Sequence, residues 1–319
     1  MDLSILTQTI AQSVVMRLSN KIKKEWKTMN NVLVTGGSGF IGGHLVQALH
    51  DTYPNINITV VDDLRTPGNH IVDSNRVSYY YKSIQDPEVV GTLKARKSFD
   101  TIFHLANTPR VRRAIEFPVE TIDNNVTSTS AVCDIALEHS SHVFFAQSSS
   151  VQYEDQGTLD NAYTLSKSFC DQMLDMFTYQ YGLHVTKMYY YSVYGPREAD
   201  YGPYSTVVRR FKQRVQESKP LEIYGNGTKA RDFTHVADVV SNMMLMMEDP
   251  RVINGEISSV HFGRGKPRTI QEIADAFNHP QLYKFDLPGE AQITECQHPY
   301  GEYVYDVLEY IKEWVGKQN

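Results

Sequence analysis

Tyr163 and Lys167 are four residues apart in a predicted helix, so both side chains lie on the same helix face. A phenol has an ordinary pKa near 10, which is too high for a base at neutral pH. A neighbouring ammonium group lowers the pKa of the phenol and favours phenolate. Ser148, at the end of the predicted strand 142–147, can donate to the same substrate oxygen. The three residues predict a site that removes a proton from an alcohol; the alternative is that the helix pair is only surface decoration, since the chain has 20 tyrosines.

A glycine-rich turn earlier in the chain predicts what accompanies that base. The apolar strand 31–35 runs into Gly36, and an amphipathic helix follows. Gly36 permits the tight turn, Gly39 lets a pyrophosphate approach the backbone, and Gly42 lets the helix pack closely on the strand. The first helical N–H groups, at Phe40 and Ile41, then face the phosphates. Because strand and helix flank the glycines, we expect a dinucleotide site, whose positive nicotinamide would lower the pKa of Tyr163 further.

Two carboxylates follow the second predicted strand. Asp62 stands about 20 residues beyond the glycines, where a carboxylate accepts hydrogen bonds from both adenosine ribose hydroxyls, and Asp63 is next to it. A 2′-phosphate would meet like charge there, which favours NAD over NADP. Arg65 is the counter-argument, because an arginine can hold such a phosphate.

The elements that position these residues alternate along the chain. Strands are predicted at 31–35, 57–62, 76–81, 100–105, 142–147 and 184–190, and helices at 40–51, 86–95, 118–139, 161–181 and 204–218. This alternation predicts an α/β fold, a Rossmann-type doubly wound parallel sheet with helices on both faces. Turn-rich sequence after Pro196 predicts a smaller C-terminal substrate lobe. We expect an NAD-binding domain at 29–190 with returns at about 232–262, and a substrate lobe at 191–231 and 263–319.

Composition excludes several other classes. The net charge of −6 disfavours a nucleic-acid surface. Three widely spaced cysteines give neither a disulfide framework nor a metal site, which fits the cytoplasm. No apolar run approaches the ~20 residues that span a membrane. Residues 1–28 form a basic amphipathic segment that we expect to lie outside the fold, with a membrane-surface or partner helix as the alternative.

Several motifs in the same order resemble those of the extended short-chain dehydrogenase/reductases, in particular the NAD-dependent epimerase/dehydratase family acting on nucleotide sugars. The likeness runs from residue 30 to about 275. Its pieces are the glycine loop, Asp62, 104–106, Asn125, Ser148, Tyr163 with Lys167, 194–197, and 225–238. The resemblance implies that Tyr163 is the base, Ser148 binds the sugar hydroxyl, and Lys167 positions the cofactor and Tyr163.

The same resemblance implies further contacts. Cofactor contacts are expected at Ser83, Ile84, Leu105, Ala106, Asn107, Asn125, Tyr190 and Val193, and substrate contacts at Ser148, Ser192, Arg197, Tyr224 and Arg231. Arg231 would hold the substrate diphosphate, which suits a guanidinium fork. The alternative for Arg231 is an ion pair with Asp232 or Asp238. Ser83 and Ser192 depart from the family, which usually has Asp and often has Asn there.

Ser149 and Ser150 decide between the family's reactions. Dehydratases of this family place Asp and Glu at these positions, and decarboxylases keep a Glu. Without that carboxyl pair, dehydration lacks its acid and base. We therefore expect an NAD-dependent epimerase resembling UDP-hexose 4-epimerases, acting through a transient 4-keto sugar. The alternatives are a nucleotide-sugar dehydrogenase or reductase, a 4,6-dehydratase or decarboxylase, and a nucleotide-binding protein that has lost turnover. The family also implies a homodimer through the helices at 118–139 and 161–181.

Overall fold

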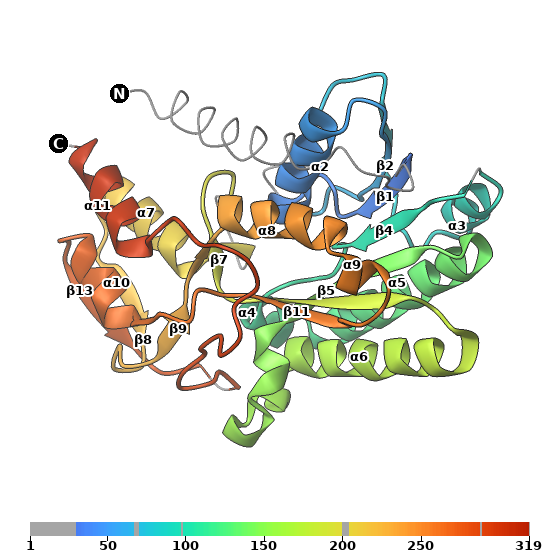
Figure 1. Ribbon diagram of the computed structural model, residues 1–319. Coiled ribbons are helices and arrows are strands. Elements are labelled where there is room, and N and C mark those ends of the chain that lie inside the picture. The colour runs from blue at the N-terminus through green and yellow to red at the C-terminus, as the bar shows by residue number, and fades with distance from the viewer. Residues whose placement is uncertain (1–29, 67–69, 97, 200–203, 288, 319) are drawn as a thin grey trace.

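A parallel sheet of seven strands forms the centre of the protein (Figure 1). The structure is a computed structural model that describes residues 30–66, 70–96, 98–199, 204–287 and 289–318. The strand order is β11-β6-β5-β4-β1-β2-β3, and every neighbouring pair is parallel. The strands are β1 (Asn31–Thr35), β2 (Asn57–Val61), β3 (Val77–Tyr80), β4 (Thr101–His104), β5 (His142–Ser148), β6 (Val185–Tyr190) and β11 (Ser259–Phe262). The predicted strands are confirmed to within a residue or two at their ends.

Helices cover both faces of the sheet, which confirms the doubly wound fold (Figure 1). One face packs against α2 (Phe40–Thr52) and α8 (Val236–Glu248). The other face packs against α3 (Pro87–Lys94), α5 (Pro118–His139) and α6 (Ala162–Tyr181). Both cores consist of apolar side chains that water does not reach, and their burial is the main force holding the layers together.

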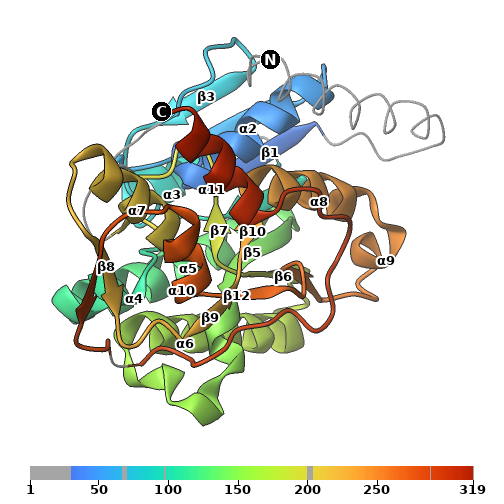
Figure 2. The same ribbon diagram turned by 90° about the vertical axis from the view of Figure 1, so that its left-hand side faces the viewer.

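A smaller lobe with its own core lies beside the carboxyl ends of the strands. Figure 2 looks on to this lobe, with α7 (Val207–Gln216), α10 (Ile270–Ala276) and α11 (Val307–Gly316) in front of the sheet. Its strands pair as β7 (Val193–Tyr194) with β10 (Thr234–His235), β8 (Leu221–Tyr224) with β13 (Gln281–Lys284), and β9 (Ala230–Asp232) with β12 (Pro267–Thr269). Helix α7 begins later than the predicted 204, because the Thr206 side chain caps its first turn at Arg209 N.

Five helices of the described residues were not among the predicted ones: α4 (Val111–Glu116) after β4, α8, α9 (Pro250–Ile253) after α8, and α10 and α11 in the smaller lobe. The stretch between Ser148 and α6 forms three 3₁₀ turns, at 149–152, 154–156 and 158–160. The expectation for residues 1–28 lies outside the described residues. In the part of the chain that is described, no helix is long and apolar enough to cross a bilayer.

The glycine loop is the tightest point of the fold. Gly36 has a φ of 72°, and a Cβ there would lie 2.8 Å from Ala106 N. A Cβ on Gly42 would overlap the carbonyl oxygen of Gly36, so α2 can pack this close to the end of β1 only without a side chain. Gly39 precedes α2 without a side-chain cap, so the first helical N–H groups open on to the carboxyl edge of the sheet.

We expect Gly42→Ala to lower the free energy of unfolding by at least about 2 kcal/mol, because its methyl group overpacks backbone that has no room to move. The measurement is the midpoint of thermal or urea unfolding. Gly91→Ala is the matched control: Gly91 lies on α3 with nothing within 4 Å of the place that a Cβ would occupy, so alanine should stabilise by about 0.5–1 kcal/mol. Equal midpoints for Gly42→Ala and the unmutated protein would contradict the overlap.

Candidate active site

A cavity of about 470 Å³ runs along the carboxyl edge of the sheet and into the lobe. It opens at the carboxyl ends of the neighbouring strands β1 and β4, where the strand order reverses, which is the switch point at which ligands bind in such sheets. The structure brings most of the predicted site residues to its wall: Gly36, Gly39, Phe40, Ile41, Gly42, Asp62, Asp63, Ser83, Ile84, Leu105, Ala106, Asn107, Ser148, Tyr163, Lys167, Tyr190, Ser192, Val193, Tyr224 and Arg231.

Asn125 and Arg197 are the two predicted site residues that do not line the cavity. The amide of Asn125 is fully buried and bonds Thr108 N (2.6 Å), Thr108 O and Ser166 Oγ, so it fixes a loop rather than a ligand. Arg197 has a φ of 66° and lies on the surface, where its guanidinium contacts His70 at 2.6 Å. The direct contacts predicted for these two residues are corrected accordingly.

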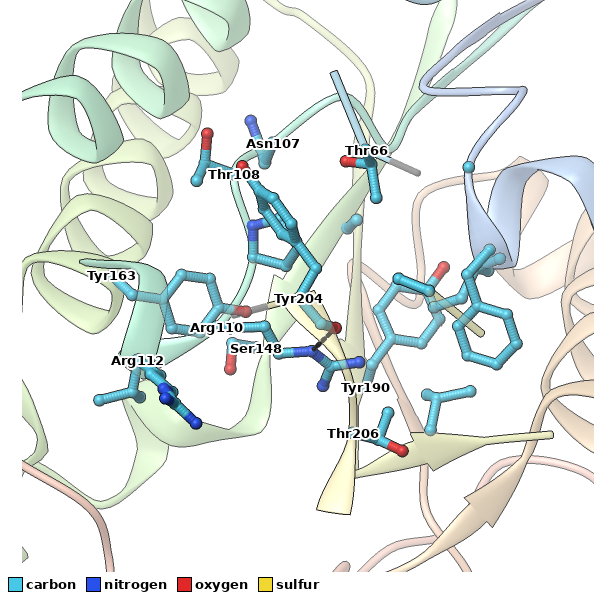
Figure 3. A pocket seen from close by; sticks show the side chains of 18 of the residues that line it. Thr66, Asn107, Thr108, Arg110, Arg112, Ser148, Tyr163, Tyr190, Tyr204 and Thr206 are labelled. Atoms are coloured by element: carbon cyan, nitrogen blue, oxygen red, sulfur yellow. Dashed lines mark hydrogen bonds between the residues drawn. The ribbon is translucent and has the colours of Figure 1, made fainter. Parts of the chain in front are cut away.

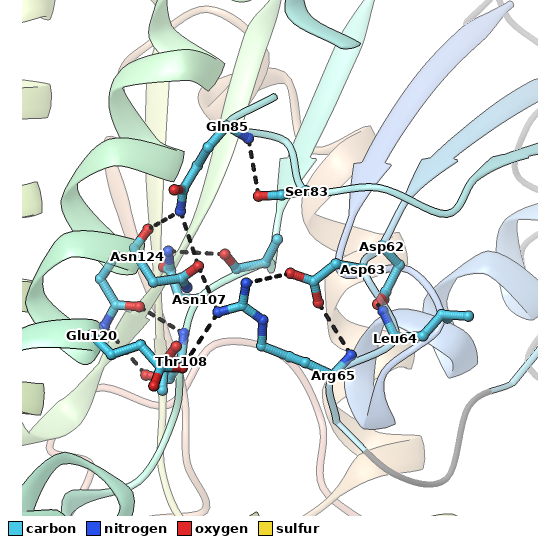
Figure 4. Close-up of polar contacts among 12 residues, drawn as sticks. Asp62, Asp63, Leu64, Arg65, Ser83, Gln85, Asn107, Thr108, Glu120 and Asn124 are labelled. Atoms are coloured by element: carbon cyan, nitrogen blue, oxygen red, sulfur yellow. Dashed lines mark hydrogen bonds and ion pairs between the residues drawn. The ribbon is translucent and has the colours of Figure 1, made fainter. Parts of the chain in front are cut away.

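At one end of the cavity, Asp62 holds the backbone (Figure 4). Its two oxygens accept hydrogen bonds from Ser38 N and Leu64 N, both at 2.9 Å. Burial raises the pKa of Asp62, and the bonds from Leu64 and Ser38 oppose that rise. Each carboxylate oxygen can accept more than one bond, so Asp62 can organise the glycine loop and still accept from ribose hydroxyls.

Arg65 forms ion pairs with two carboxylates at the same end of the cavity as Asp62. Its guanidinium contacts Asp63 at 2.6 Å and Glu120 at 3.7 Å, and it donates to Asn124 Oδ1 at 3.2 Å (Figure 4). The Asn124 oxygen also accepts from Gln85 Nε2. Two carboxylates thus neutralise the positive charge of Arg65 that a 2′-phosphate would need as its partner. This agrees with NAD rather than NADP.

Ser148 and Tyr163 face one another in the middle of the cavity (Figure 3). Tyr163 lies at the start of α6, whose N-cap Asn161 accepts from Thr164 N. Burial raises the pKa of Tyr163, while a hydrogen bond with Ser148 and the charge of Arg110 lower it. Arg110 is therefore a cation of the protein that favours the phenolate, and the effect of Lys167 on the phenol stays a prediction.

Lys167 is buried and its ammonium group is already hydrogen-bonded. It donates to Ala146 O at 2.5 Å and to Asn107 Oδ1, and it lies 4.6 Å from the centre of the Phe145 ring. Burial lowers the pKa of Lys167 to about 8. These contacts hold the lysine at the wall beside the tyrosine.

Hydroxyl groups surround Ser148. Ser150 Oγ lies 2.8 Å from Ser148 Oγ and accepts from Thr164 Oγ1 at 3.1 Å. Ser149 is buried next to them. A carboxylate of the lining, Glu198, is also buried, but its oxygens accept from Gly195 N and the Thr206 hydroxyl. The side-chain groups at the Ser148 hydroxyl are therefore hydroxyls rather than carboxylates, and the backbone N–H of Ser150 also donates to it.

Arg231 reaches the cavity from β9 in the lobe. Its guanidinium donates to Ala291 O at 2.8 Å and pairs with Glu290 at 3.2 Å. The alternative pairing with Asp232 or Asp238 is wrong, because those carboxylates accept backbone N–H groups instead: Asp232 from Arg264 and Gly265, and Asp238 from Val304 and Tyr305.

The sequence interpretation missed a group of polar residues in the lining: Arg110, Arg112, Asn124, Glu198, Tyr204, Arg210 and Glu290. One signal was available. The basic run 110–113 follows directly on a buried strand whose carboxyl end faces the predicted cofactor site. The lobe residues had no such signal, because they come together only through long-range packing.

Comparison with known proteins places the chain in a family. The model of the NAD dependent epimerase/dehydratase family matches residues 32–260. A UDP-N-acetyl-alpha-D-glucosaminuronate decarboxylase of Bacillus cytotoxicus is 31% identical over 76% of this chain and 77% of its own. A UDP-glucose 4-epimerase of Halalkalibacterium halodurans is 26% identical over 81% and 82%.

Solved structures agree on the fold. A UDP-N-acetylglucosamine 4-epimerase from Methanobrevibacter ruminantium, in complex with UDP-N-acetylmuramic acid, superposes with a TM-score of 0.78 at 24% identity, covering 90% of this chain and 97% of that one. The glycine loop, the carboxylate after β2 and the buried tyrosine and lysine fit the cofactor that the family uses. The chain belongs to the NAD-dependent epimerase/dehydratase family.

Proposed function

We propose that this enzyme is a nucleotide-sugar epimerase, resembling UDP-hexose 4-epimerases, that inverts C4 through a transient 4-keto sugar. The observation that carries the proposal is the Ser148–Tyr163 pair at the wall of the cavity, with Lys167 next to it and serines where other reactions need carboxylates. Relatives named as UDP-glucose and UDP-glucuronate 4-epimerases support the same reaction.

The protein's own residues handle the proton. Tyr163 as phenolate takes the proton of the sugar 4-hydroxyl and later returns it to the same oxygen. Ser148 hydrogen-bonds that oxygen and the phenol, so the proton moves along a short path. Lys167 holds the wall through Ala146 and Asn107 and presents a charge to the cofactor ribose. Bound NAD supplies a reversible acceptor of hydride.

The neighbourhood of Ser148 favours epimerisation over elimination. Loss of water from the sugar needs an acid and a base of its own. Here Ser149 and Ser150 occupy those positions, and the hydroxyl of Ser150 is held by Ser148 and Thr164. The cavity of about 470 Å³ gives a keto sugar space to turn over between the two transfers.

We expect Tyr163→Phe to lower turnover by at least about 10²-fold, since phenylalanine cannot exchange a proton, while NAD remains bound. Purified protein is incubated with UDP-sugars without added cofactor, and C4 inversion is followed by NMR. Inversion with no net change in NADH absorbance supports an epimerase. A stoichiometric absorbance change would instead identify a dehydrogenase, and inversion by Tyr163→Phe at the wild-type rate would remove Tyr163 as the base.

The pH dependence of activity should reveal the effect of the Arg110 charge on Tyr163. Its charge lowers the pKa of Tyr163, and the phenolate is the active form, so activity rises with pH through that pKa. Arg110→Gln removes the charge, and the pKa of Tyr163 then rises. We expect the ascending limb of the kcat/KM profile to move to higher pH; an unmoved limb would show that Arg110 does not act on the base.

We further propose a cytoplasmic homodimer. One face of α6 exposes three large apolar side chains: Phe169 (45%), Met176 (40%) and Tyr179 (91%). An exposed apolar stripe of this kind favours a second copy of the helix. The cysteines at 133, 170 and 296 are free and buried, which suits a reducing compartment. Analytical ultracentrifugation should give a dimer that Phe169→Glu converts to a monomer, and cell fractionation should find the protein with cytoplasmic markers.

A further inference from the structure

Arg110 is held in the cavity at a cost to the backbone. It links the loop after β4 to α4, with a φ of 83° and a ψ of 127°, a region that side chains other than glycine rarely adopt. Its Nε donates to Tyr204 O at 3.1 Å. Strained residues of this kind persist where the surrounding structure imposes them, and they concentrate at functional sites.

No carboxylate in the described part of the chain pairs with the charge of Arg110. Elsewhere along the cavity wall, Lys229 pairs with Asp286 at 2.6 Å, and Arg231 pairs with Glu290. Within the described ranges, no carboxylate forms an ion pair with the Arg110 guanidinium, and its two terminal amino groups make no hydrogen bond. The buried Glu198 feels its charge, but the oxygens of Glu198 accept from Gly195 N and Thr206.

Two more guanidinium groups add to the positive field. Arg112 has one distant ion-pair partner among the residues that the structure describes, Glu116 at 3.7 Å. Arg210 comes from α7, and its Nε has no hydrogen-bond partner among the described residues. Burial first, and then the charges of Arg112 and Arg110, lower the pKa of Arg210. Like charges grouped in a partly buried cavity repel one another, so this arrangement is suited to an anionic ligand.

The position of Arg110 beside Tyr163 indicates which part of a bound sugar it would contact. In the view of Figure 3 its guanidinium projects between the rings of Tyr163 and Tyr190. Tyr163 acts on the 4-hydroxyl, whereas the diphosphate is attached at C1, on the opposite side of the pyranose ring. C3 and C5 are the ring positions next to C4, and of their substituents only the one at C5 is a carboxylate in a sugar acid, whereas the one at C3 is a hydroxyl. A cation beside Tyr163 lies next to these two positions, so C5 is where an anionic group of the sugar can meet Arg110, and Arg231 and Arg210 remain for the diphosphate.

We propose that the substrate sugar carries a carboxylate at C5, so that the substrate class is a nucleoside-diphosphate hexuronate, and that Arg110 binds this carboxylate through its two terminal amino groups. The inference rests on the proposed function. A planar guanidinium fork matches a carboxylate with two charge-assisted hydrogen bonds. The neutral hydroxymethyl group of a hexose offers the Arg110 guanidinium no charged acceptor.

The test measures binding in a background where turnover is blocked. Tyr163→Phe with NAD bound is titrated calorimetrically with UDP-glucuronate and with UDP-glucose. We expect UDP-glucuronate to bind at least about 10-fold more tightly. Adding Arg110→Gln should bring the two dissociation constants to within about 2-fold of each other by weakening UDP-glucuronate alone, and Arg110→Lys should restore part of the preference.

Arg112→Gln in the same background is the charge-matched control. It lies two residues away on α4 and should change both affinities by a similar factor. Equal binding of the two sugars by the unmodified cavity would overturn the inference, as would a preference that survives Arg110→Gln. A preference for UDP-glucuronate with no C4 inversion in wild-type protein would overturn the proposed function alone, whereas inversion of UDP-glucose without that preference would overturn the hexuronate class alone.

Discussion

The site depends on a point in the fold where no side chain fits. The loop leaving β1 passes against Leu105 and Ala106, and the first turn of α2 lies on the carbonyl of Gly36. This close approach brings the ends of β1 and β4 together with the start of a helix whose N–H groups are free. The rest of the cavity is positioned relative to that point, because the neighbouring strands end along the same edge and carry the acidic, amide and hydroxyl groups of the site there.

Burial sets the chemistry at the middle of the cavity. It works against charge on both groups that matter there: the pKa of Tyr163 rises and that of Lys167 falls to about 8. Contacts from neighbouring protein groups, rather than from solvent, stabilise the charged forms of these two side chains. Ser148 and Arg110 act on the phenol, while a backbone carbonyl and the Asn107 amide hold the ammonium. The tyrosine and lysine thus have separate supports, although they are one helical turn apart.

Local signals predicted the scaffold well, because each depends on adjacent residues: strand–helix alternation indicated the sheet, and Pro118 at the first position of α5 marks its start. The direction in which a helical side chain points was harder to predict. Asn124 and Asn125 differ by about 100° around α5, and only Asn124 reaches the cavity. Contacts between segments far apart in the sequence were the hardest to predict, since Arg231 pairs with Glu290 rather than with its near neighbours in sequence. Such a contact depends on how the segments of the smaller lobe pack together, and the periodicity of a single element carries no information about that.

The segment after β13 runs from the smaller lobe back along the sheet domain, and hydrogen bonds to buried side chains hold its backbone in place. Asp232 accepts from Cys296 N, Asn242 binds the backbone of Glu302 through both its amide nitrogen and its oxygen, and Asp238 accepts from the backbone at 304 and 305. These acceptors are buried, so removing the segment would leave charged and polar groups without partners. The sheet and the smaller lobe therefore depend on one another for folding, and we expect them to melt in one cooperative transition.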